Sequence, residues 1–114
     1  MTHRDKDQSA EKIAQLNDAF RTTFIGGRLM VTMGVSALPE SVQSEVLRAV
    51  QAFNTFTPDN DPHGEHDFGR VEVADYLVFW KIDYYDESLR YSSEDPADPS
   101  VTIRVLTVML TEEY

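Results

Sequence analysis

The chain has 114 residues, of which 41% are hydrophobic and 26% charged, enough for one globular domain and too few for two. It contains no cysteine, which excludes disulfides, thiolate metal sites and cysteine nucleophiles. Its longest apolar run is residues 76–80, far below the roughly 20 residues that a membrane span needs, and no signal-peptide core follows its charged start. A cytoplasmic protein without membrane contact is therefore expected.

The net charge of −10 is distributed unevenly along the chain. Residues 1–58 carry six acidic and six basic side chains, whereas residues 59–114 carry fourteen acidic and four basic ones. Direct nucleic-acid binding needs clustered Lys and Arg to neutralise phosphates, so it is not expected. A one-sided negative field instead attracts basic partners, although it also serves plain solubility.

The first half of the chain predicts two helices and one strand. Residues 1–8 are polar and are expected to form a flexible tail before a single domain over 9–114. Ser9 can cap a helix over residues 10–22, in which apolar residues recur at helical spacing. Residues 28–35 have the composition of a short buried strand. An apolar stripe after Pro39 predicts a second helix that ends near residue 53.

The next segment predicts a β-hairpin. Pro and Gly punctuate residues 54–65, so this stretch is expected to be a loop. Strands over 66–73 and 76–85 then meet at Ala74-Asp75, and with a two-residue turn Val73 faces Tyr76. That register places six residues on the core face: Val71, Val73, Tyr76, Val78, Trp80 and Ile82. It also sets His66 across from Asp83, a pairing that a three-residue turn would break.

The C-terminal part predicts a polar loop over 86–98 and a last helix over 99–112. The many β-branched residues of 101–108 also permit a strand, but the spacing of Val101, Val105 and Val108 favours a helix. The element order α-β-α-β-β-α then predicts an α+β fold in which a small antiparallel sheet packs against three helices.

A dense run of potential metal ligands lies in residues 59–67. A calcium loop fails because Arg70 stands where a bidentate Glu is needed. A divalent transition metal would use Asp61, His63 and His66, provided that a tight turn brings the imidazoles together. The alternative is that His63 closes the loop through hydrogen bonds and that no cofactor is bound.

A second constellation is the expected pair His66 and Asp83, because a carboxylate behind an imidazole orients a general base. No nucleophile motif accompanies this pair, so a water would have to attack the substrate. A cross-strand hydrogen bond that only satisfies two polar groups is the alternative.

Acidic and aromatic side chains alternate after residue 82. Tyr and Trp are favoured at interface centres, and together with carboxylates they suit an Arg- or Lys-rich partner. The expected partner-binding residues are Asp83, Tyr84, Tyr85, Asp86, Glu87 and Glu94. The alternative is that the aromatic residues pack in the core.

The chain resembles a bacterial family catalogued as domain of unknown function 3768. The resemblance runs from Ile13 to Tyr114. Its carriers are residues 16–21 (LNDAFR), 34–39 (GVSALP), 59–69 (DNDPHGEHDFG), 80–86 (WKIDYYD), 95–99 (DPADP), 104–107 (RVLT) and 112–114 (EEY). Relatives tend to carry Asp-Gly at Ala74-Asp75, which leaves the exact turn open. Members occur on plasmids and integrated elements near antirestriction-like genes, which implies a role in mobile-element biology.

Three hypotheses follow. The leading one is an acidic, non-enzymatic interaction module that binds a basic protein surface, such as an antirestriction or anti-CRISPR-like antagonist of a nucleic-acid-binding protein. The second is a small metal-dependent or His/Asp-assisted hydrolase built on the loop 59–67. The third is a homodimer in which the hairpin edge pairs with its twin.

Overall fold

The computed structural model describes residues 3–114, with side chains described from Ser9 onward. The helices are α1 (His3–Thr23), α2 (Met33–Ser36) and α3 (Glu40–Ala52), the strands are β1 (Arg28–Val31), β2 (Phe68–Val73), β3 (Tyr76–Tyr85) and β4 (Ile103–Leu110), and a 3₁₀ turn, η1 (Thr111–Glu113), follows. Residues 1–2 of the expected tail lie outside the described residues. Among the helices described, none combines the length and apolar character that crossing a membrane requires.

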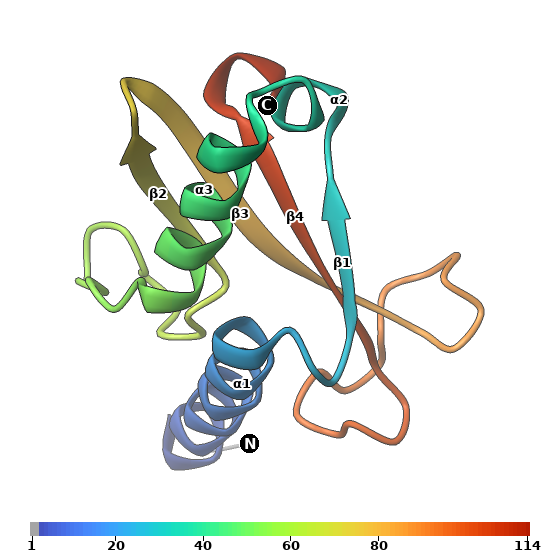
Figure 1. Ribbon diagram of the computed structural model, residues 1–114. Helices are drawn as coiled ribbons and strands as arrows, with labels where there is room; N and C mark the ends of the chain where they lie inside the picture. The colour runs from blue at the N-terminus through green and yellow to red at the C-terminus, as the bar shows by residue number, and fades with distance from the viewer. Residues whose placement is uncertain (1–2) are drawn as a thin grey trace.

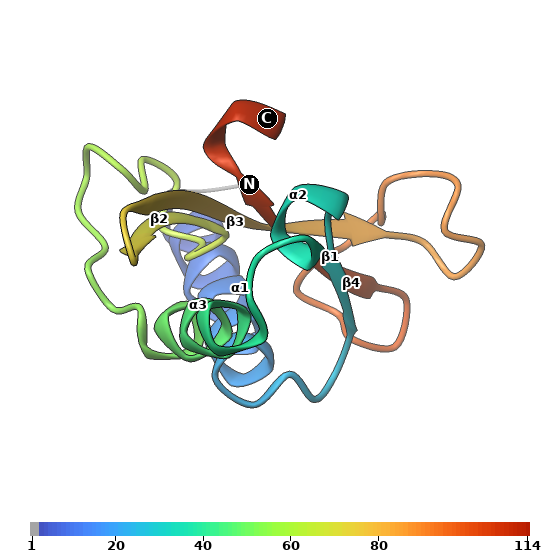
Figure 2. The ribbon, with the colours of Figure 1, turned by 45° about the horizontal axis from the view of Figure 1, so that its top comes forward.

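The four strands form one mixed sheet in the order β1-β4-β3-β2 (Figure 1). β4 pairs parallel with β1 and antiparallel with β3, and β2 pairs antiparallel with β3. Figure 2 shows α1 and α3 together on one face of the sheet, with η1 on the other. The α+β class is therefore confirmed, but the sheet is mixed and not antiparallel throughout, because β1 pairs parallel with β4.

The segment expected as a last helix over 99–112 is mostly strand β4. Its side chains alternate between buried positions at Arg104, Leu106 and Val108 and half-buried positions between them. β4 lies between β1 and β3, so both of its edges are hydrogen-bonded, and its β-branched residues pack well on the pleated surface. Apolar residues on both faces produced the spacing that resembled a helical stripe.

The hairpin of β2 and β3 confirms the expected register. Val73 pairs with Tyr76 across a two-residue turn, and both turn residues have positive φ, 49° at Ala74 and 68° at Asp75. Positive φ at both central positions is the geometry of the tight turn that matches strand twist. Ala74 adopts the left-handed region despite its Cβ, so the hairpin itself sets the turn.

Two boundaries in the first half differ from expectation. Helix α1 begins at His3 rather than at residue 10, so residues 3–8 belong to a helix instead of a tail; no Gly or Pro interrupts this stretch. The strand expected over 28–35 ends at Val31 because residues 33–36 form the short helix α2. Helix α3 matches the predicted second helix to within one residue at its end.

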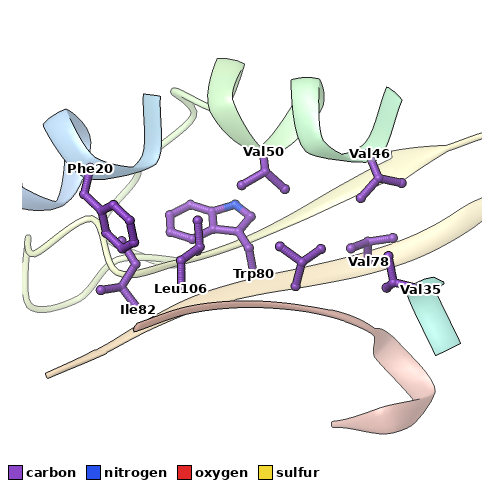
Figure 3. Packing of buried hydrophobic residues seen from close by; sticks show 9 residues of the cluster. Phe20, Val35, Val46, Val50, Val78, Trp80, Ile82 and Leu106 are labelled. Atoms are coloured by element: carbon purple, nitrogen blue, oxygen red, sulfur yellow. The ribbon is translucent and has the colours of Figure 1, made fainter. Parts of the chain in front are cut away.

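The core lies between the sheet and the two long helices (Figure 3). Phe20 of α1 and Val46 and Val50 of α3 point toward the sheet, where Trp80 and Leu106 meet them. Val78 and Ile82 are also buried, as the predicted core face of the hairpin requires. Tyr76, which was expected on the same face, is exposed because it lies next to the turn at the end of the hairpin. Burial of these side chains stabilises the fold by about 1.5–3 kcal/mol each.

The C-terminal turn η1 ties the end of the chain to the β1–α2 corner. The carboxylate of Glu113 accepts hydrogen bonds from the Thr32 hydroxyl at 2.6 Å, from Leu110 N at 2.8 Å and from Gly34 N at 2.9 Å. The bond from the Thr32 hydroxyl, followed by those from the backbone, lowers the pKa of Glu113 from its ordinary value of 4.5.

We expect Glu113→Gln to lower the melting temperature at neutral pH, with an effect that fades in acid. Because the folded-state pKa of Glu113 lies below 4.5, its stabilising contribution is complete above that value and is lost as the pH falls through the folded-state pKa. Melting curves from about pH 7 down to about pH 3 measure this difference. Glu112→Gln, at the exposed neighbouring residue, is the control. If the melting temperature of Glu113→Gln stayed below that of the wild type by the same amount over this pH range, the stabilising role of the Glu113 carboxylate would be contradicted.

Candidate functional site

The structure separates the predicted site residues into three places. His63 and His66 lie in the loop between α3 and β2, Asp83 and Tyr84 lie on β3, and Glu87 and Glu94 lie in the connection between β3 and β4. They do not form one site.

His66 does not pair with Asp83, so the predicted catalytic pair is wrong. Strand β2 begins only at Phe68, and His66 has a φ of 56°, which turns the chain out of the sheet before the expected pairing. Nδ1 of His66 lies 2.9 Å from Asp18 Oδ2, and Nε2 lies 3.7 Å from Asp61 Oδ2. The ring stacks on Phe56 with centroids 3.9 Å apart. Both ring nitrogens therefore face carboxylates, and Asp83 instead pairs with Lys81 at 3.0 Å.

The three residues of the metal hypothesis share one pocket but do not form a ligand set. Asp61, His63 and His66 line a pocket of about 530 Å³ together with Phe56 and Glu11. The buried carboxylate of Asp61 accepts a hydrogen bond from His66 N at 3.2 Å, which fixes the loop. Among the side chains of residues 9–114, no three from His, Asp or Glu are grouped so that they could hold a metal ion.

Tyr84 is half-buried and packs against the core, with its hydroxyl engaged in hydrogen bonds. Its hydroxyl accepts a hydrogen bond from Asn17 Nδ2 at 2.8 Å and donates one to Glu65 Oε1 at 2.9 Å. Burial is the main reason that the pKa of Tyr84 lies far above its ordinary value of 10.0. The hydroxyl stays protonated and serves as a structural link between β3, α1 and the loop before β2.

Asn17 and Arg104 form the centre of this buried network, which the sequence analysis missed. Asn17 is fully buried, and its Oδ1 accepts a hydrogen bond from Arg104 Nε at 2.7 Å while its Nδ2 donates to Glu65 O at 2.9 Å. The Arg104 guanidinium lies 5.2 Å from the Tyr84 ring and donates to Pro96 O. Burial lowers the pKa of Arg104 from its ordinary value. The network therefore connects α1 to the loop before β4.

The spacing of α1 contains the signal that could have identified Asn17. It lies four residues after Ile13 and three before Phe20, so all three share one face of the helix. A polar residue on the apolar face of an amphipathic helix is buried and needs partners.

The connection between β3 and β4 is held in shape by short-range hydrogen bonds. Asp86 Oδ1 accepts from Ser88 N at 3.1 Å and from Ser88 Oγ at 2.6 Å, and Asp86 N donates to Tyr91 O at 2.8 Å. The bond from the Ser88 hydroxyl lowers the pKa of Asp86, and the bond from the Ser100 hydroxyl does the same for Asp98. Both carboxylates therefore remain charged well into the acidic range.

A hollow of about 610 Å³ opens on this connection. It is lined by Asp86, Glu87, Ser88, Tyr91, Ser92, Glu94 and Val101, with no Lys or Arg among them. Tyr91 is 69% exposed, and Val101 is also exposed. We call this surface the acidic hollow; it combines three of the predicted partner-binding residues with an accessible aromatic ring.

A second hollow of about 320 Å³ adjoins the acidic hollow and shares Ser92 with it. Asp67, Asp83 and Tyr85 are among its lining residues. Burial, followed by the nearby Glu65 carboxylate, raises the pKa of Asp67. The two hollows together bring five carboxylates to neighbouring parts of one surface.

Comparison with family models matches residues 31–113 to the family described as "Protein of unknown function (DUF3768)". No curated protein and no solved structure matches the chain.

Proposed function

We propose that the chain, which belongs to the DUF3768 family of proteins of unknown function, is a non-enzymatic module that binds a basic protein surface through its acidic hollow. The supporting observation is the lining of this hollow, which contains three carboxylates and no basic side chain. Exposed carboxylates beside an exposed tyrosine suit Arg and Lys side chains, because ion pairing and cation–π contact act together.

The local structure of the hollow supports this function. The hydrogen bonds of Asp86 fix the shape of its rim before any partner arrives, so binding orders fewer groups than it would on a flexible loop. Neighbouring Asp67 extends the acidic surface, whereas the charge of Asp83 is balanced by Lys81. A negative surface speeds encounter with a positively charged partner. A partner that uses the same basic surface to bind nucleic acid would be blocked, so we propose that the chain is an antagonist of such a protein.

We expect the double variant Glu87→Lys/Glu94→Lys to bind an arginine-rich peptide at least about tenfold more weakly than the wild type, which corresponds to roughly 1.4 kcal/mol. Both side chains line the acidic hollow and are exposed, and neither takes part in the hydrogen bonds that shape the loop. Isothermal titration calorimetry at two salt concentrations measures the effect, and wild-type affinity is expected to fall as salt rises.

The matched control is Glu72→Lys/Glu112→Lys, which makes the same change in net charge at two exposed residues on β2 and η1. It is expected to retain most of the affinity. If both double variants lost the same affinity, the effect would come from net charge alone, which would contradict a defined binding site. Affinity that does not change with salt would contradict the electrostatic basis of the proposal.

Hydrolysis at the His66 cluster is the second candidate function, supported by the pocket that Asp61, His63 and His66 share. Two observations weigh against hydrolysis. Asp18 and Asp61 face the ring nitrogens of His66, and Thr57 is the one hydroxyl-bearing residue that lines this pocket. Metal titration followed by melting curves tests it, since a ligand that binds the folded state raises the melting temperature.

A further inference from the structure

The edge of the sheet at β1 carries unpaired backbone groups. Thr32 N donates to Val108 O, and alternate residues of a parallel strand face the same neighbour, so Arg28, Met30 and Thr32 direct their N–H and C=O groups toward β4. Leu29 and Val31 therefore direct theirs outward. None of the helices in residues 3–114 covers this outer side of β1 (Figure 1).

The side chains at this edge are apolar and exposed. Ile25 is 78% exposed, Met30 54% and Met33 87%. Arg28 is the only charged residue between Arg21 and Glu40. Exposed edge strands are normally protected from pairing by charged residues or by covering segments.

The opposite edge of the sheet shows such protection. Strand β2 carries the exposed charged side chains of Arg70 and Glu72. Residues Thr55 and Asn60 of the preceding loop lie beside Arg70, where they line a common pocket. This contrast makes β1, and not the hairpin edge, the surface suited to pairing.

We propose that β1 pairs antiparallel with β1 of a second copy, about a two-fold axis at Met30. In this register Leu29 lies opposite Val31 of the second copy, and the reverse holds on the other side of the axis. Residues that direct both N–H and C=O outward form the hydrogen-bonded pairs of an antiparallel ladder, which is the pattern that Leu29 and Val31 present. Met30 meets its own copy at a non-hydrogen-bonded position, where side chains approach closely.

The charges at the edge match this register. Arg28 lies opposite Thr32 of the second copy, and the Thr32 hydroxyl is bonded to Glu113 Oε1 at 2.6 Å. The exposed Arg28 forms no ion pair with the side chains described from Ser9 onward, so its guanidinium can approach the Glu113 carboxylate of the other chain. The two-fold axis makes this opposite-charge contact twice.

A second copy fits this edge for an electrostatic reason as well. Two chains of net charge −10 repel each other over most approaches, because the excess acidic residues lie in the second half of the sequence. The segment 22–39 contributes one positive charge and no negative one, so this edge presents little repulsion. Pairing about a two-fold axis also covers the exposed β1 edge of both copies, so the assembly closes as a dimer and does not grow further.

Light scattering of the full chain, together with a charge-swap pair at Met30, tests the proposal. We expect the wild type to reach twice the 13.0 kDa of one chain as its concentration rises. Met30→Lys and Met30→Glu each place like charges opposite one another, so each variant alone is expected to be monomeric. An equimolar mixture of the two is expected to restore the doubled mass, because only a residue that faces its own copy can be rescued in this way.

Leu77→Lys is the matched control, since Leu77 is another exposed apolar strand residue and lies away from β1. It is expected to dimerise as the wild type does. A wild type that remains monomeric at every concentration overturns the proposal. So does a mixture of the two Met30 variants that stays monomeric, or an Arg28→Glu variant that dimerises as strongly as the wild type.

Discussion

Replacing Asn17 with alanine is expected to lower the free energy of unfolding by about 3 kcal/mol. The fully buried amide of Asn17 accepts a hydrogen bond from Arg104 Nε and donates to Glu65 O and to the Tyr84 hydroxyl. An alanine leaves the buried guanidinium of Arg104 without its closest side-chain acceptor and leaves two further groups with fewer partners. Urea unfolding measures the loss, and the slope of the transition is expected to stay unchanged.

Two further variants separate the causes of this loss. Asn17→Asp keeps an acceptor for Arg104 but cannot donate to Glu65 or Tyr84, so its stability is expected to lie between those of wild type and alanine. Gln15→Ala alters an exposed residue of the same helix and is expected to change stability by less than about 0.5 kcal/mol. An Asn17→Ala loss below about 1 kcal/mol would show that the network contributes little.

The same network links the core to the proposed binding surface. Arg104 donates to Pro96 O in the connection between β3 and β4, whose first half forms the acidic hollow. Loss of Asn17 is therefore expected to loosen this connection as well as α1. A buried polar network of this kind fixes one arrangement of the loop, which an apolar core alone would not specify.

The sequence predicted those parts of the fold in which one physical signal dominates. Helix α3 shows a single apolar stripe, and the β2–β3 hairpin alternates clearly enough to set its register and its core face at Val78, Trp80 and Ile82. Strand β4 was missed because it is central in the sheet and apolar on both faces, so period two was masked. Its parallel pairing with β1 depends on contacts between distant residues, which local pattern does not reveal.

For the candidate site, the sequence was informative only about acidic residues that lie close together in a polar loop. Asp86, Glu87 and Glu94, which were grouped as partner-binding residues from the sequence, line one hollow, and the binding itself stays a prediction. His66 does not take its predicted place in the strand, because its left-handed backbone ends the strand early. A histidine at this position does not by itself indicate that conformation. Its partner Asp18 lies 48 residues away along the chain, on α1, and no local pattern connects the two.

Replacing Arg21 with methionine is expected to lower the free energy of unfolding by about 3 kcal/mol. The guanidinium of Arg21 is buried and donates to Val50 O at 3.1 Å and Gln51 O at 3.0 Å, at the C-terminal end of α3. It also pairs with Asp18 at 3.0 Å. Methionine keeps the apolar stem but removes the Arg21 donor from both carbonyls, so that Val50 O retains only the 3.3 Å bond from Phe53 N. The last carbonyls of a helix lack the full set of internal partners that those farther inside have.

The environment of Trp80 provides an independent readout for Arg21. The Arg21 guanidinium lies 5.2 Å from the Trp80 ring, and Trp80 is the only tryptophan of the chain, so its fluorescence is expected to change in Arg21→Met. Arg21→Lys keeps the charge but loses the planar fork, so its free energy of unfolding is expected to lie between those of the wild type and Arg21→Met. Arg48→Met changes an exposed arginine on α3 and is the matched control. If Arg21→Met were as stable as Arg48→Met and left the fluorescence unchanged, Arg21 would not be what holds α1 against the end of α3.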